Sequence, residues 1–171
     1  MDAHDLRALQ APLKQQYRDR PDVAMVTLKA SGRLDTPGVS CHVETGRAIV
    51  EAGLHPATGG SGLQACSGDM LLEALAACAG VTLRAVATAL DIPVRGGVVE
   101  VEGDLDFRGT LGVSKEVPVG FQTIRLRFNL DTDATMEQLD TLLKLTERYC
   151  VVFQTLRTPS RVSASVSKQK D

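Results

Sequence analysis

Residues 67–90, SGDMLLEALAACAGVTLRAVATAL, decide the fold of this 171-residue chain. The segment is long enough for a central helix, and it is apolar nearly all round, with charges only at Asp69, Glu73 and Arg84. Ser67 is suited to cap its first turn, and Asp69 complements the positive end of the helix dipole. Because so little of this helix is polar, we expect other elements to cover it.

Cys78 lies at the middle of this segment. At 100° per residue it shares a helix face with apolar and small side chains, namely Leu71, Ala74, Leu75, Thr82, Ala85 and Ala89. A cysteine in such surroundings is most commonly a small core residue. Burial raises the pKa of a thiol, and mid-helix is too far from the positive end of the dipole to lower it. A reactive Cys78 therefore needs a cation brought from elsewhere.

The composition is that of an ordinary globular domain. Hydrophobic residues make up 43% and charged residues 23%, and the formal net charge is −2, which provides no basic field for nucleic acid or anionic membranes. With 4% aromatic residues and no Trp, base stacking is not expected. The polar N-terminus, MDAHDLRALQ, is unlike a secretory signal, so we expect a cytoplasmic protein. Glu73 and Arg84 argue against a membrane-spanning role for the long helix.

The cysteines give no metal signature. Cys41, Cys66, Cys78 and Cys150 lack the close-paired spacing of zinc sites. Cys41 and His42 are adjacent, but neighbours in a strand point to opposite faces. We therefore expect no metal and no cofactor. In a cytosolic chain a disulfide is more commonly transient and catalytic than structural.

Before the central segment, the pattern predicts one helix and then antiparallel strands. Apolar residues at helical spacing over 3–17 indicate an N-terminal helical extension spanning residues 1–20. Strands are predicted over 23–30, 39–43 and 47–52, and a turn from Ser31-Gly32-Arg33 through Pro37-Gly38. Residues 53–68 are rich in Gly and Ser and lack periodicity, and a long loop beside a central helix is more commonly functional than idle.

After the central segment, three further strands and two helices are predicted. Alternating residues indicate strands over 99–107, with Val99, Val101, Leu105 and Phe107 inward, over 121–130, and over 162–166. Thr135 and Gln138 can form a capping box for a helix that ends near Tyr149, and residues 151–156 predict a further helical turn. Residues 168–171 form a polar tail. The whole chain, 1–171, is predicted to be one α+β domain with antiparallel strands wrapped around a buried central helix.

Two stretches, GDMLLEALAACAGVTLR at 68–84 and TERYCVVFQTL at 146–156, resemble the OsmC/Ohr (osmotically inducible protein C and organic hydroperoxide resistance) family. The resemblance extends over roughly 22–167 and leaves the N-terminal helix outside. It implies an OsmC-like intertwined homodimer with the cysteines near the interface.

The resemblance also implies a thiol peroxidase. Cys78 would be the peroxidatic thiolate that attacks an organic hydroperoxide, and Cys150 the resolving thiol that forms a disulfide with it. A small or protein-bound dithiol would reduce that disulfide. The hydroperoxide branch pairs its thiolate with an arginine from an early loop, for which Arg33 is the best positional match and Arg47 the second. Asp69 matches the acidic residue of the family's cysteine helix.

The chain departs from the family pattern in two places. Val151 follows the second cysteine where the family usually has Pro, and Asp69 stands where it often has Glu. On an ideal helix Asp69 lies about 180° around and about 13 Å from Cys78, so it can act only by orienting an arginine or a loop. Asp69 is also explained more simply as a helix-start residue.

Two alternatives to the enzyme stay open. The first is a dimer of the same fold that binds a small apolar or electrophilic ligand without turnover. The second is a purely structural, stress-induced dimer. Non-reducing mobility after mild peroxide treatment separates the peroxidase from both.

Overall fold

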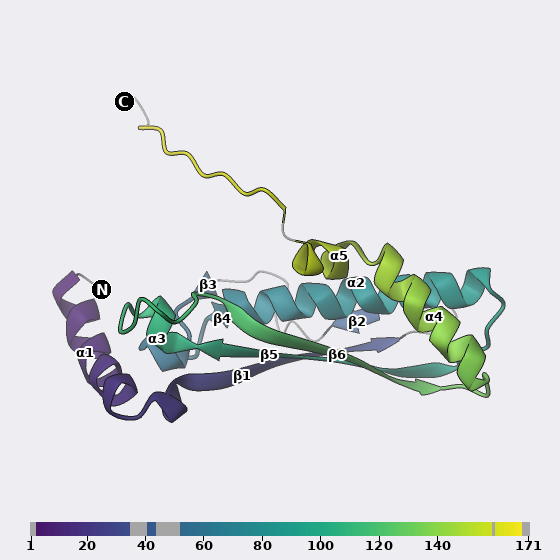
Figure 1. The fold of residues 1–171 in the computed structure, drawn as a ribbon, viewed down its shortest axis with the longest axis horizontal. Coiled ribbons are helices and arrows are strands. Elements are labelled where there is room, and N and C mark those ends of the chain that lie inside the picture. Colours follow the sequence, from purple (N-terminus) through teal and green to yellow (C-terminus); the bar gives the residue numbers. More distant parts are fainter. Residues whose placement is uncertain (1–2, 35–40, 44–51, 159, 169–171) are drawn as a thin grey trace.

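The computed structural model describes residues 3–34, 41–43, 52–158 and 160–168. Figure 1 shows a long sheet with several helices gathered along one of its faces. The elements in chain order are α1 (Ala3–Asp19), η1 (Pro21–Ala24), β1 (Met25–Leu34), β2 (Cys41–Val43), β3 (Ala52–Gly53), η2 (Pro56–Thr58), β4 (Ala65–Cys66), α2 (Ser67–Ala89), β5 (Gly96–Asp106), α3 (Phe107–Thr110), β6 (Phe121–Asp131), α4 (Met136–Tyr149) and α5 (Val151–Arg157).

The main sheet is antiparallel throughout, as the sequence predicted. Its strand order is β2-β1-β5-β6, and each neighbouring pair runs antiparallel. β3 and β4 form a separate two-residue parallel pair. The strand predicted over 47–52 falls almost wholly outside the described residues.

The sheet has one apolar face and one polar face. On the polar face, β5 and β6 place Glu102 opposite Arg125 and Glu100 opposite Arg127. Arg125 pairs with Glu102 at 3.3 Å and also with Asp104. Such exposed pairs contribute little stability, about 0–1 kcal/mol each. These charges instead help to fix the strand register, because a shift of one residue would move every charge to the core face.

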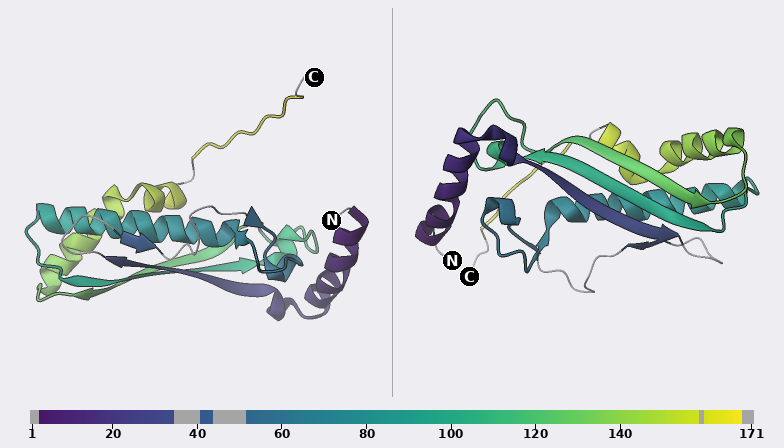
Figure 2. Two further views of the ribbon diagram at one scale, coloured as in Figure 1. Left: turned by 180° about the vertical axis from the view of Figure 1, so that it is seen from behind. Right: turned by 90° about the horizontal axis from the view of Figure 1, so that it is seen from below.

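α2 lies on the apolar face and is confirmed as the long helix of the fold (Figures 1 and 2). Eight of its residues are buried, Leu72, Leu75, Ala76, Ala79, Gly80, Leu83, Arg84 and Ala87. Six of them, all but Gly80 and Arg84, share one core with Val99 and Val101 of β5, Leu142 of α4 and Cys150. By length and composition α2 passes as a membrane span, a test that core helices also pass.

The start of α4 follows the sequence prediction in detail. The Thr135 amide donates to Gln138 Oε1 at 2.9 Å, and the Gln138 amide donates to Thr135 Oγ1 at 3.3 Å. This reciprocal capping box fixes the helix start. α4 ends at Tyr149, as predicted, and α5 follows directly.

The turn predicted at Ser31-Gly32-Arg33 is wrong. β1 continues to Leu34, and its register with β5 runs as far as Arg33 opposite Val98. β5 is eleven residues long and supplies ladder partners beyond residue 30, so the backbone of 31–33 pairs instead of turning. Local glycine content predicted the turn, and a distant strand overrode it.

The strand assignment of Phe107 is also wrong. β5 ends at Asp106, and Phe107 opens the short helix α3. A register irregularity between Asp104 and Leu105 reverses the alternation of faces. Asp106, expected to face solvent, is 1% exposed. Its carboxylate accepts from the Arg108 amide at 3.0 Å and from Arg108 Nη2 at 2.5 Å.

Two smaller predictions fail as well. The N-cap of α2 is Cys66, which makes no side-chain capping bond, and Ser67 is the first helical residue. Residues 160–168 form no strand and extend away from the body of the molecule (Figure 1). A strand needs a ladder partner, and within the described part of this chain none pairs with that segment.

The predicted N-terminal helix is present, and it packs at the far end of the sheet (Figure 2). Tyr17 of α1 belongs to a small second core with Ala24, Phe107 and Leu111. The Tyr17 hydroxyl donates to the Ala57 carbonyl at 2.7 Å. α1 therefore anchors the loop that precedes α2.

Candidate active site

The structure brings Cys78 and Cys150 together. Cys78 lies mid-way along α2, and Cys150 occupies the junction between α4 and α5, where it ends one helix and caps the next. The two thiols lie close enough to shift each other's pKa values, and both are free. Seventy-two residues separate them in sequence, so this contact is a product of the tertiary fold.

The elbow around Cys150 is held by its own hydrogen bonds. The Cys150 amide donates to Thr146 O at 2.9 Å, which completes the last turn of α4. The Phe153 amide donates to Cys150 Sγ at 3.5 Å, so the thiol acts as the N-cap of α5. Gln154 Nε2 reaches back to Glu147 O at 2.7 Å and ties α5 to α4. The first amides of α5 are therefore fixed beside the two sulfurs.

The surroundings move the pKa values of the two thiols in opposite directions. Burial raises the pKa of Cys78, but hydrogen bonds from the Val152 amide, the Cys150 thiol, the Val151 amide and the Thr82 hydroxyl outweigh it. The pKa of Cys78 therefore lies below the ordinary thiol value. Burial raises the pKa of Cys150 to about 11, and its hydrogen bond with Cys78 and the charge there add to the effect, against donation from the Phe153 amide.

This pattern assigns unequal chemistry to the two sulfurs. A thiolate is the nucleophilic form of cysteine, and it is favoured at Cys78 and disfavoured at Cys150. In the described part of the chain, neutral donors lower the pKa of Cys78, and no guanidinium is among them. The sequence did not reveal these donors, because the amides come from α5 through the tertiary fold, and activation of Cys78 by a cation stays a prediction.

The structure gives the elements that carry the two other predicted site residues, Arg33 and Asp69. Arg33 stands in β1, opposite His42 of β2 and Val98 of β5, and Arg47 lies outside the described residues. Asp69 sits in the first turn of α2. Burial raises the pKa of Asp69, and the nearby His55 acts in the opposite direction. The catalytic roles predicted for Arg33 and Asp69 stay predictions.

His55 is a residue to which the sequence pattern assigned nothing. Its ring stacks on Phe107 with centroids 4.9 Å apart. Its Nδ1 accepts from the Ala57 amide at 3.0 Å, capping η2. His55 thus holds η2 in the loop before α2 and packs that loop against α3. A lone histidine in a Gly-rich loop carries no spacing signal that reveals this.

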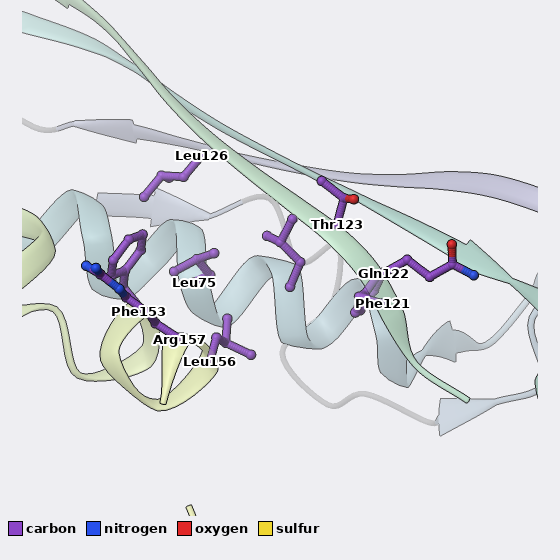
Figure 3. Close-up of a pocket in the computed structure, with 9 residues that line it drawn as sticks. Leu75, Phe121, Gln122, Thr123, Leu126, Phe153, Leu156 and Arg157 are labelled. Atoms are coloured by element: carbon purple, nitrogen blue, oxygen red, sulfur yellow. The ribbon is translucent and has the colours of Figure 1, made fainter. Parts of the chain in front are cut away.

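A cavity of about 330 Å³ adjoins the cysteine region. Figure 3 shows side chains from α2, β6 and α5 converging on it. The lining residues are Leu75, Phe121, Gln122, Thr123, Ile124, Leu126, Phe153, Leu156 and Arg157. Leu75 lies one turn before Cys78, and the Phe153 amide donates a hydrogen bond to Cys150 Sγ. The volume is at the lower end for small-molecule sites.

Metal chemistry has no donor set in the described part of the chain. No three His, Cys, Asp or Glu side chains there are grouped so that they could hold a metal ion. The site is thus defined by a thiol pair, backbone amides and a hydroxyl, on an α+β fold whose core is one long helix. These features define a dithiol protein in which the pKa of one cysteine is lowered and that of the other is raised.

Comparison with known proteins identifies the family. A family model described as OsmC-like protein matches residues 60–165, more than half of the chain, and the chain therefore belongs to the OsmC-like family. The structure is similar to the crystal structure of an OsmC-like hydroperoxide resistance protein from Jannaschia sp. CCS1, with a TM-score of 0.62 and 16% sequence identity over 86% of this chain and 97% of that one. A search of curated proteins found no match. The resemblance predicted from the two cysteine segments is confirmed, and α1 lies outside the matched region.

Proposed function

We propose that this protein reduces organic hydroperoxides by a two-cysteine cycle. The observation that carries the proposal is the placement of Cys78 on α2 beside Cys150 at the junction of α4 and α5, where each thiol shifts the pKa of the other and the two pKa values move in opposite directions. A peroxidatic cysteine needs to be a thiolate, whereas a resolving thiol is best kept protonated until it is used. The name of the Jannaschia relative, a hydroperoxide resistance protein, supports the same reaction class.

In the first step the Cys78 thiolate attacks the terminal oxygen of the hydroperoxide. A sulfur–oxygen bond forms, the O–O bond breaks, and the alkoxide leaves and takes up a proton as the alcohol. Cys78 is then a sulfenic acid, two electrons more oxidised. Cys150 next attacks that sulfur, a disulfide forms, and the sulfenic oxygen leaves as water with the Cys150 proton. A dithiol reductant restores both thiols by exchange.

The proposal includes a homodimer. On α2, Met70, Leu71 and Val81 form an apolar stripe on either side of Cys78, and each is 38–39% exposed in the single chain. Such a helix face is normally covered. Among the described strands β6 stands at an edge of the sheet, so its outer row of backbone groups can pair with another chain.

The C-terminal segment supplies a suitable strand for that edge. Val162 and Val166 are 91% and 97% exposed, and valine and alanine alternate with serine over 162–167. Alternation of this kind is typical of a strand with one buried face. We propose that the segment adds to β6 of a second copy, which accounts for the strand that the sequence predicted and the single chain does not form.

Peroxide consumption by the intact protein tests the reaction. With dithiothreitol as reductant, cumene hydroperoxide is expected to be consumed faster than hydrogen peroxide, because apolar side chains line the cavity. Cys78→Ser should abolish turnover, since a neutral hydroxyl is a far weaker nucleophile at pH 7. Cys150→Ser should allow one stoichiometric oxidation without recycling, and Cys66→Ser is the control. Turnover by Cys78→Ser would rule the cycle out.

Light scattering tests the dimer. The full chain should give the mass of two copies at micromolar concentration, and truncation after Thr158 should weaken or abolish the assembly. A stable monomer for the full chain contradicts the proposal.

The cytoplasmic location stays part of the proposal, because a cytoplasmic dithiol pool would supply the reductant, and fractionation of cells checks it.

A second function is favoured by the cavity alone. Its mostly apolar lining with Arg157 at one side suits a small apolar or electrophilic ligand held without turnover. In that case the protein does not consume peroxide. An apolar fluorescent probe should bind the wild type and should bind the Phe153→Asp variant more weakly, because that substitution puts a charge in the cavity wall.

A further inference from the structure

Arg157 is the one charged side chain among the described residues that line the cavity beside the cysteines. The rest of that lining is apolar, apart from the neutral side chains of Gln122 and Thr123. Pockets of this kind gain affinity from apolar contact, and the few polar groups in their walls provide the selectivity. The ligand preference of this cavity therefore depends on what Arg157 binds.

Arg157 belongs to the same wall of the cavity as Phe153. It lies in the last turn of α5, four residues after Phe153, so the two side chains share the face of α5 that borders the cavity. Figure 3 shows both extending from α5, with Thr123 and Leu126 on β6. The aliphatic part of an arginine side chain can pack on apolar surface while its guanidinium stays in contact with water. Arg157 can therefore border an apolar ligand and still present its charge at the opening.

The guanidinium of Arg157 is available to a ligand. The residue is exposed, and no carboxylate in the described part of the chain forms an ion pair with it. Arg95, Arg108 and Arg125, in contrast, are each paired with an aspartate. A guanidinium presents a planar fork of donors that matches a carboxylate through two parallel hydrogen bonds. The group that best complements this wall is therefore a carboxylate.

The helix α5 also sets the distance between this charge and the reacting atoms. Arg157 lies seven residues after Cys150, and at 1.5 Å per residue the helix separates them by about 10 Å along its axis. Leu75, one turn before Cys78, and Phe153 mark the end of the cavity nearer to the cysteines. A molecule with its hydroperoxide at that end has room for a second group about 8–10 Å away, beside Arg157.

We propose that Arg157 makes this site selective for compact organic hydroperoxides that carry a carboxylate about 8–10 Å from the peroxide group. The carboxylate binds the guanidinium, the apolar body fills the cavity, and the hydroperoxide is directed toward Cys78. The inference rests on the proposed peroxidase for its reaction, but the preference for an anion is a property of the cavity that binding can test by itself. Arg157 is thus a specificity-determining residue and takes no part in the transfer of electrons.

Two hydroperoxides with the same skeleton test this preference in the full-length protein. Cumene hydroperoxide is neutral, and its para-carboxy derivative carries a carboxylate on the opposite side of the ring. For the wild type, kcat/KM should be about fivefold higher for the carboxylate, the effect expected of a partly exposed ion pair. Arg157→Gln should bring the ratio of the two kcat/KM values to about one. Arg157→Lys keeps the charge without the fork and should give an intermediate ratio.

Arg148 provides the matched control. It is exposed, lies two residues before Cys150, and has its guanidinium over the Tyr149 ring, 5.5 Å from the centroid. It is not among the residues that line the cavity. Arg148→Gln removes the same charge near the cysteines and should keep the wild-type ratio. The inference is overturned if Arg148→Gln lowers the ratio as much as Arg157→Gln does, or if the wild type shows no preference.

Binding of an unreactive pair separates this inference from the proposed function. 4-Isopropylbenzoate and 4-isopropylbenzyl alcohol share the skeleton but lack the peroxide, and calorimetric titration measures their affinities. If neither hydroperoxide is consumed, but the benzoate binds more tightly and Arg157→Gln removes the difference, the peroxidase fails and the carboxylate site stands. If both hydroperoxides are consumed with equal efficiency and both probes bind equally, the carboxylate site fails and the peroxidase stands.

Discussion

The two cysteines should differ in reactivity by a margin that can be worked out from their surroundings. The pKa of Cys150 is raised to about 11, so its thiolate fraction at pH 7 is about 0.01%. The pKa of Cys78 lies below the ordinary value of 9.0, so its thiolate fraction exceeds about 1%. Cys78 therefore has at least about 100 times more thiolate.

Thiolate abundance is partly offset by intrinsic nucleophilicity. A thiolate of lower pKa is a weaker nucleophile, with a Brønsted slope of about 0.4–0.5, which removes about tenfold of the advantage over a two-unit difference. Cys78 should thus be alkylated at least about tenfold faster than Cys150 at pH 7. Cys150 is also fully buried, and this widens the difference.

Iodoacetamide labelling with peptide mass analysis provides the measurement. In the Cys78→Ala variant, Cys150 loses the hydrogen bond and the charge that help to raise its pKa, so its pKa should fall and its labelling should accelerate. In Cys150→Ala, Cys78 loses a donor and its pKa should rise. Cys66→Ala should change neither profile. Equal or faster labelling of Cys150 in the wild type would refute the assignment of Cys78 as the nucleophile.

Three further predictions concern stability. Asp106→Ala should lower the free energy of unfolding by about 2–3 kcal/mol, because it removes a cap and the partner of Arg108. Since hydrogen bonds from Arg108 lower the pKa of Asp106, this stabilisation is present above about pH 4 and lost as pH falls through the lower folded-state pKa, which urea titrations at pH 3 and 7 would show as a shrinking difference between variant and wild type. Thr146→Val should stabilise by about 1 kcal/mol, because the Thr146 hydroxyl is buried without a hydrogen-bond partner among the described residues; a lower melting temperature contradicts it. Leu72→Ala should cost about 3–5 kcal/mol through the cavity it leaves in a fully buried site, and a loss below 1 kcal/mol in calorimetry argues against the tight packing of α2.

Sequence alone was enough for the elements whose signals are local. The apolar run of 67–89 predicted the long helix that packs on the sheet, and the Thr135–Gln138 capping box marks the start of α4 through bonds three residues apart. The alternation in β5 and β6 defines a polar and an apolar face of the sheet, and the two cysteine segments are specific enough to indicate the OsmC-like family, which the family model confirmed.

Features that depend on distant partners were decided by the tertiary structure. The backbone of 31–33 pairs because β5 extends beside it, and Asp106 turns inward because a register irregularity reverses the strand faces. Residues 162–166 were predicted to form a strand, but residues 160–168 have no ladder partner within the described chain.

The site shows the same division most clearly. A sequence reader finds Cys78 and Cys150 but cannot know which donors surround them. The first amides of α5 approach Cys78 only because α4 and α5 meet at an elbow against α2. Hydrogen bonds between residues remote in sequence leave no periodic pattern in the sequence. The direction in which the pKa of each thiol shifts is therefore set by the folded structure alone.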